Sequence, residues 1–82
     1  MSMERQILKQ EHLALKQKKM ELAVEAGGKI GSIKNLLARA SLLPIPEIDM
    51  EVVASLAVEA RDLRRQYIDV CAKIVQIEKE LE

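Results

Sequence analysis

Arg61, Arg64 and Arg65 form the densest basic cluster in the chain, and their spacing gathers them on one side of a helix. If the chain folds back on itself, Lys29 and its neighbouring glycines lie opposite this cluster, where a ligand can approach the backbone closely. Four such cations could hold an anion or a phosphate group. The alternative is a solvated face on which these side chains pair with nearby carboxylates, and we favour it.

Few other residues have the types or spacing that chemistry requires. His12 is the one histidine and Cys71 the one cysteine, which excludes an internal disulfide and gives no metal-ligand pattern. The glycines lack the spacing of a phosphate-binding loop. The all-helical chorismate mutases are similar in size and helicity, but the arginine, lysine and glutamine pattern of their pocket does not map onto this sequence. We therefore expect no enzyme, no catalytic residue, no metal and no cofactor.

The amino-terminal arm is basic and suggests a second function. Its cations could contact the phosphates of a nucleic acid; they are Arg5, Lys9, Lys16, Lys18 and Lys19, with His12 among them. Acidic residues interleave with them, and the chain has no Phe or Trp and a single Tyr for base stacking. A nucleic-acid-associated regulatory role through this basic face is therefore the alternative to the protein–protein interaction role predicted below.

The two prolines, Pro44 and Pro46, mark the one clear chain reversal. Proline removes a backbone donor and disfavours helix in the residue before it. Asp49 then has the position of a helix N-cap. We predict one domain over residues 1–82, with helices over about 3–42 and 49–81 joined by a turn over 43–48.

The second helix carries the clearest pattern in the sequence. Apolar residues follow an uninterrupted heptad repeat, which predicts a coiled-coil seam; they are Val53, Leu56, Ala60, Leu63, Tyr67, Val70, Ile74, Ile77 and Leu81. A second apolar row runs beside this seam and includes Ala57, Ile68, Cys71 and Val75. One neighbouring helix covers one stripe, so we expect the second row to meet a further helix.

The first helix is less regular. One heptad phase contains Leu8, Leu15, Leu22 and Leu36 but is interrupted by Lys29, and the companion phase turns apolar only in its later part. We therefore expect the half nearest the turn to pack well and the amino-terminal half to pack loosely.

Three glycines interrupt the same helix and predict a weak point over residues 27–31. A break at Gly27 would give three helices. Because the leucine phase resumes unchanged beyond the glycines, we favour one continuous helix. Ala23, Gly27 and Gly31 also form a row of small residues that could admit a crossing helix at close approach.

Charge divides unevenly between the two arms, although the net charge of the 82 residues is zero. Residues 1–43 carry eight basic and four acidic side chains, whereas residues 44–82 carry five and nine. This contrast favours packing one arm against the other. In an antiparallel hairpin, facing residues would have numbers that sum to about 92. His12 would then lie near Glu78, Tyr67 near Glu25, and Lys29 within reach of Glu59.

The fold class predicted is all-α: an antiparallel two-helix coiled-coil hairpin that dimerises into a four-helix bundle. We expect a non-enzymatic protein–protein interaction module, such as a small adaptor, chaperone-like or regulatory protein. Its partners would be a second copy or a helical protein. The sequence shows no signal peptide or 18-residue apolar span, so we expect a cytoplasmic location and no membrane contact.

Overall fold

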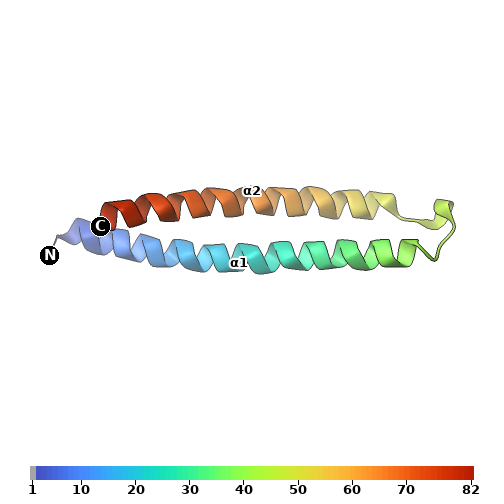
Figure 1. Ribbon diagram of the computed structural model, residues 1–82, viewed down its shortest axis with the longest axis horizontal. Coiled ribbons are helices and arrows are strands. Elements are labelled where there is room, and N and C mark those ends of the chain that lie inside the picture. Colours follow the sequence, from blue (N-terminus) through green and yellow to red (C-terminus); the bar gives the residue numbers. More distant parts are fainter. Residues whose placement is uncertain (1) are drawn as a thin grey trace.

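The chain forms an extended hairpin of two helices. The computed structural model describes residues 2–82 and places helix α1 at Met3–Ala40, a short 3-10 helix η1 at Ile45–Glu47 and helix α2 at Met50–Leu81. The helices run antiparallel, with both termini at one end and the turn at the other (Figure 1). The rod measures 66 × 15 × 14 Å. The described residues contain no strand, so the all-α hairpin is confirmed.

Side-chain caps and prolines set the ends of the helices. The Ser2 hydroxyl accepts a hydrogen bond from the Arg5 N–H at the start of α1, and the Asp49 carboxylate accepts one from the Val52 N–H at the start of α2. Each satisfies a donor that has no partner within its helix. α1 ends at Ala40, where the Ser41 hydroxyl donates to the Ala38 carbonyl. Pro44 is the N-cap residue of η1.

Helix α1 is continuous through its three glycines. No glycine among the described residues has a positive φ, so none needs the left-handed conformation that favours glycine. A Cβ atom built on Gly27, Gly28 or Gly31 would meet nothing within 4 Å. The alternative of a break at Gly27 is therefore wrong, and no described segment makes the close approach that these glycines would permit.

The heptad positions of both helices face each other along the rod. Every residue of the predicted α2 seam is buried or half-buried, including the small Ala60 and the polar Tyr67. On α1 the less exposed positions repeat with alternating steps of three and four residues; they are Leu8, His12, Leu15, Lys19, Leu22, Ala26, Lys29, Ile33, Leu36 and Ala40. Gly31 is half-buried outside this series. A single heptad phase thus runs through the glycines.

The buried side chains gather in the half of the rod away from the turn, which we call the terminal half (residues 2–22 and 63–82). Leu22 is the most buried, at 3% exposed, and it packs with Leu63, Val70 and Ile74; Ile77 is also buried. Between residues 23 and 62 no described residue is buried. The expectation that the half nearest the turn packs best is therefore wrong. Its seam includes Ala26, Ala40 and Ala60, and side chains as short as alanine leave the gap between two helices partly open.

Four contacts between the helices fix their register. The residue numbers sum to 86 for Arg5–Leu81 and Lys19–Tyr67, 88 for Lys29–Glu59 and 90 for His12–Glu78. The expected sum of about 92 was therefore a few residues too high. Tyr67 accordingly lies beside Lys19 and not beside Glu25, whereas the predicted proximity of His12 to Glu78 and of Lys29 to Glu59 is confirmed.

Candidate interaction surfaces

Polar residues of α1 occupy seam positions and find partners on α2. The Arg5 guanidinium donates to the Leu81 carbonyl at 2.7 Å, and the Lys29 ammonium lies 3.0 Å from the Glu59 carboxylate. The Lys19 ammonium lies 5.8 Å from the centre of the Tyr67 ring, a cation–π distance. Lys19 and Lys29 are half-buried, so their aliphatic stems lie in the seam and their charges reach its edge, whereas Arg5 is exposed. These contacts are specific to the antiparallel register.

His12 is the seam residue with the least complete polar environment. Its Nε2 atom is enclosed and lies 3.3 Å from a Glu78 carboxylate oxygen, without the geometry of a hydrogen bond. The Glu78 side chain is 56% exposed, so the pair sits at the edge of the seam. Because the Glu78 carboxylate is largely exposed to solvent, the pair contributes little to stability.

The second apolar row of α2 faces solvent. Ile68 is 46% and Val75 52% exposed, Ala57 is exposed, and Cys71 is half-buried with a free thiol. Helix α1 covers the seam but leaves this row open. Within residues 2–82 no further segment covers it, because these residues form one hairpin.

One side of the hairpin is hollowed along its middle. We call this hollow the alanine groove; it is lined by Ala23, Ala26, Ile30, Ala57, Ala60, Arg61, Arg64 and Tyr67 and has a volume of about 420 Å³. Short side chains from both helices form much of its lining. A second groove continues toward the termini, shares Ala23 and Tyr67 with it, and includes Lys16, Lys19, Met20, Ile74 and Glu78. This side of the molecule therefore combines apolar surface with positive charge.

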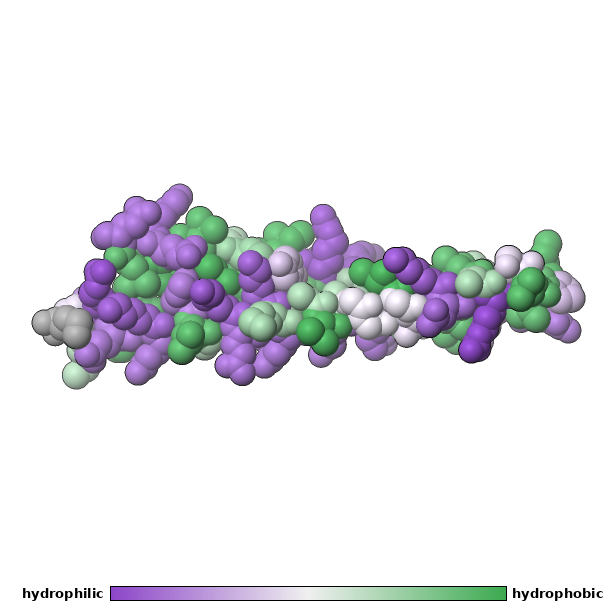
Figure 2. Space-filling view, turned by 60° about the horizontal axis from the view of Figure 1, so that its bottom comes forward, coloured by the Kyte–Doolittle hydropathy of each residue, from purple (hydrophilic) through white to green (hydrophobic). Residues whose placement is uncertain are grey.

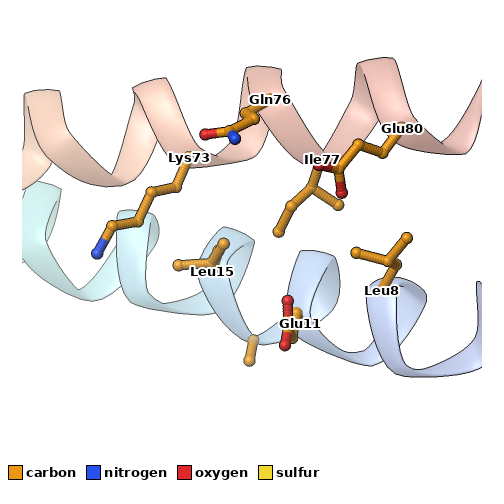
Figure 3. Close-up of a pocket in the computed structure, with 8 residues that line it drawn as sticks. Leu8, Glu11, Leu15, Lys73, Gln76, Ile77 and Glu80 are labelled. Atoms are coloured by element: carbon orange, nitrogen blue, oxygen red, sulfur yellow. The ribbon is translucent and has the colours of Figure 1, made fainter. Parts of the chain in front are cut away.

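The largest hollow lies elsewhere, near the termini. Figure 3 shows Leu8 and Leu15 of α1 and Ile77 of α2 turned toward the space between the helices, with Lys73, Gln76 and charged residues around them. Glu11 and Glu80 line it as well, so its charge is mixed. This hollow is a gap at the edge of the seam in the terminal half.

The four cations of the anion hypothesis do not converge. Arg61 and Arg64 line the alanine groove together, but the Lys29 ammonium pairs with Glu59, which does not line that groove. Arg61 also lies 3.7 Å from the Asp62 carboxylate, and Arg65 is exposed outside the groove lining. Two of the four cations, Lys29 and Arg61, thus lie beside carboxylates, as the favoured alternative expects.

The basic residues near the amino terminus are divided between two environments. Arg5, His12 and Lys19 contact α2, as described above. Lys9, Lys16 and Lys18 are exposed. The six residues therefore do not present one continuous basic face, and nothing here favours nucleic-acid binding over the main proposal.

The turn carries the most exposed large apolar side chains of the described chain. Leu42 is 86% and Ile45 84% exposed, and Leu43 is 44% exposed beside Pro44. Figure 2 shows this apolar surface at the turn end of the rod, with apolar and hydrophilic patches alternating along the remainder. Backbone hydrogen bonds, including Glu47 N–H to the Pro44 carbonyl at 2.9 Å, hold the turn in one shape. An ordered apolar tip is a surface of the kind that proteins use for contacts.

Two of these surfaces were not identified from the sequence. The alanine groove arises because alanines of both helices meet at one level, which requires the register of the hairpin. The exposed turn had a visible signal in Leu42, Leu43 and Ile45, three aliphatic residues around prolines where turns are usually polar.

Comparisons with known proteins gave no match. No protein-family model, no curated protein and no solved structure matches this chain. Within residues 2–82 no group of three or more potential ligand residues could hold a metal ion. Neither described helix is both long and apolar enough to cross a membrane.

Proposed function

We propose that the chain is a non-enzymatic protein–protein interaction module, a small adaptor, chaperone-like or regulatory protein. It acts as a homodimer whose hairpins form a four-helix bundle, or together with a helical partner. The observation that carries this proposal is the imbalance of its apolar surface. Among the described residues, five hydrophobic side chains are buried whereas fifteen large ones are exposed. Surfaces of this kind, rimmed by charge, are typical of protein contacts.

The total surface area supports the same proposal. The chain exposes 6500 Å², whereas a compact protein of its 9.2 kDa mass would expose about 4,900 Å². A stable protein interface buries about 800 Å² on each partner. The excess is therefore large enough for one or two ordinary interfaces on each hairpin.

The test is affinity capture from the native host with the wild-type chain and with Ile68→Glu. Ile68 is 46% exposed in the second apolar row, so the charge should leave the hairpin folded and remove a contact. Val24→Glu is the matched control, because Val24 is 77% exposed and lines neither the alanine groove nor the second groove that continues from it. We expect the wild type and the control to retain a common protein, a second copy included, that Ile68→Glu releases.

Light scattering at micromolar concentration completes this test. A folded chain that stays monomeric and also retains no host protein would contradict the proposed function. Circular dichroism of the three proteins verifies that they are equally helical.

A further inference from the structure

We propose that two copies of this chain pack face to face through their turn halves, with the turn of each copy seated on the Arg61–Arg64 side of the other. This inference rests on the proposed function and names the partner and the surface. The turn half, residues 23–62, contains no buried residue in the described chain, although it holds many of the exposed aliphatic side chains. It is the part of the molecule that lacks a core of its own.

Charge complementarity points to a second copy as the occupant. From Ala40 to Ala60 the chain has four acidic residues and no basic one, and Glu47 and Asp49 of this set lie at the turn. Arg61 and Arg64 follow and line the alanine groove. An acidic, apolar turn and a basic, apolar groove are complementary surfaces, and each copy carries both. Two such contacts close a dimer with two-fold symmetry.

The helical repeat allows only particular registers for this pairing. If α2 packs antiparallel on α2 of the second copy with Ala54 opposite Ala57, Arg64 lies just beyond the start of that helix, at the level of η1 and its Glu47. Arg61 then faces the second copy at the level of Met50, between Asp49 and Glu51. The acidic residues of the turn thus lie near the two arginines, and the two-fold axis passes between small alanines that let the helices approach closely.

The register of the hairpin also determines which residues of α1 face each other across the two-fold axis. Because Lys29 pairs with Glu59, the same axis crosses α1 near residue 32, which sets Leu37 opposite Gly27 of the second copy. Leu37 is 47% exposed, and a Cβ built on Gly27 meets nothing within 4 Å, so a large side chain finds open space there. Lys34 lies near the axis, and its aliphatic stem lets the ammonium reach solvent.

The antiparallel pairing of the two copies does not place the most basic segment of one copy against the same segment of the other. Residues 20–43 carry three basic and two acidic side chains, whereas five of the eight basic residues of the first arm lie between Arg5 and Lys19. That segment stays outside the overlap. The same pairing brings the exposed Leu42 and Ile45 to the level of Met20 and Tyr67 on the second copy, at the end of the alanine groove.

Charge reversal tests the pairing in solution. By sedimentation or light scattering we expect a dimer for the wild type, and a dissociation constant raised at least about tenfold by Arg64→Glu or by Glu47→Arg. The combined variant Glu47→Arg/Arg64→Glu should regain the wild-type affinity. Arg65→Glu is the control, since it makes the same charge change one residue away and outside the groove lining. Single variants that dimerise like the wild type, or a combined variant that gains nothing, would overturn the proposal.

Cysteine cross-linking locates the axis. In the background Cys71→Ser, the thiols of Ala57→Cys in the two copies are offset by about 4.5 Å along the helices and should be joined by a short bis-maleimide. The wild-type Cys71 residues would be about 46 Å apart and should not be joined. A dimer joined through Cys71 and not through position 57 would reject this surface while the interaction function stands. A monomer that retains a host protein would do the same.

Discussion

The two halves of the rod differ in what holds them together. The terminal half contains all five buried side chains and three of the four polar contacts that fix the register. The turn half has one such contact, Lys29 with Glu59, and no buried residue in the described chain. Both halves obey the same heptad repeat, so a regular pattern of apolar positions does not by itself make a core.

Side-chain size explains the difference. The seam of the terminal half contains Leu15, Leu22, Ile74 and other large aliphatic residues, which fill the gap between two helices. Alanines take several of the corresponding positions near the turn and leave a groove. Alanine has a high helix propensity but buries little apolar area. The turn half is therefore helical by local preference and unfinished in its packing.

The largest expected effect comes from removing the centre of the terminal core. Leu22→Ala should lower the free energy of unfolding by about 2–5 kcal/mol, because Leu22 is 3% exposed and packs in the buried cluster. Leu13→Ala makes the same chemical change at a side chain that is 70% exposed, and should cost less than about 0.5 kcal/mol. Urea denaturation measures both, and equal costs would mean that the terminal half has no core.

A cap of the turn half gives the next largest effect. Asp49→Ala removes the carboxylate that accepts the Val52 N–H, and should cost about 1 kcal/mol of stability. Ser2→Ala removes the equivalent cap at the free end of α1, where fraying relieves the loss, and should cost less. Thermal unfolding of the two variants compares them. If Ser2→Ala proved the more damaging, the Asp49 cap at the turn would not be the more important of the two caps.

A glycine substitution in the turn half should stabilise α1. Gly28 is exposed, has a helical backbone and has open space around its Cβ position. Gly28→Ala should therefore raise the free energy of unfolding by about 0.5–1 kcal/mol. Urea denaturation with the helical signal of circular dichroism measures this change. Destabilisation would show that this stretch of helix is not continuous in solution.

The smallest effect concerns the ion pair of the turn half. Lys29 and Glu59 have side chains that are 37% and 53% exposed, so Lys29→Ala should cost no more than about 1 kcal/mol. The cost should shrink as salt concentration rises, because salt screens exposed pairs. Denaturation at two ionic strengths is the measurement. A cost of several kcal/mol at high salt would indicate that Lys29 packs in a core.

The hairpin could be predicted from the sequence because each of its determinants is local. Pro44, Pro46 and Asp49 set the turn, and the unbroken heptads of α2 set the seam. The packing of the two halves could not be predicted from the sequence, because it depends on which side chains of the two helices lie at the same level along the rod. A register error of a few residues was enough to place Tyr67 beside Glu25, when it lies beside Lys19 at the end of the alanine groove.

The candidate surfaces also differ in whether they could be predicted from the sequence. The second row with Ile68 and Val75 follows from spacing along one helix, and the structure leaves it open to solvent. The anion hypothesis required Lys29 and Arg64 to share one side of the hairpin. The pairing of Lys29 with Glu59 directs the two cations apart, and that contact depends on the register.

Hydrogen exchange of backbone amides, measured at several protein concentrations, tests the central claim that the turn half is completed by a second copy. At low concentration we expect amides over residues 23–62 to exchange faster than those of the terminal half, because their packing is incomplete. As concentration rises, exchange in the turn half should slow until it matches the terminal half. Equal protection of the two halves at every concentration, or a turn half that is independent of concentration, would contradict the account.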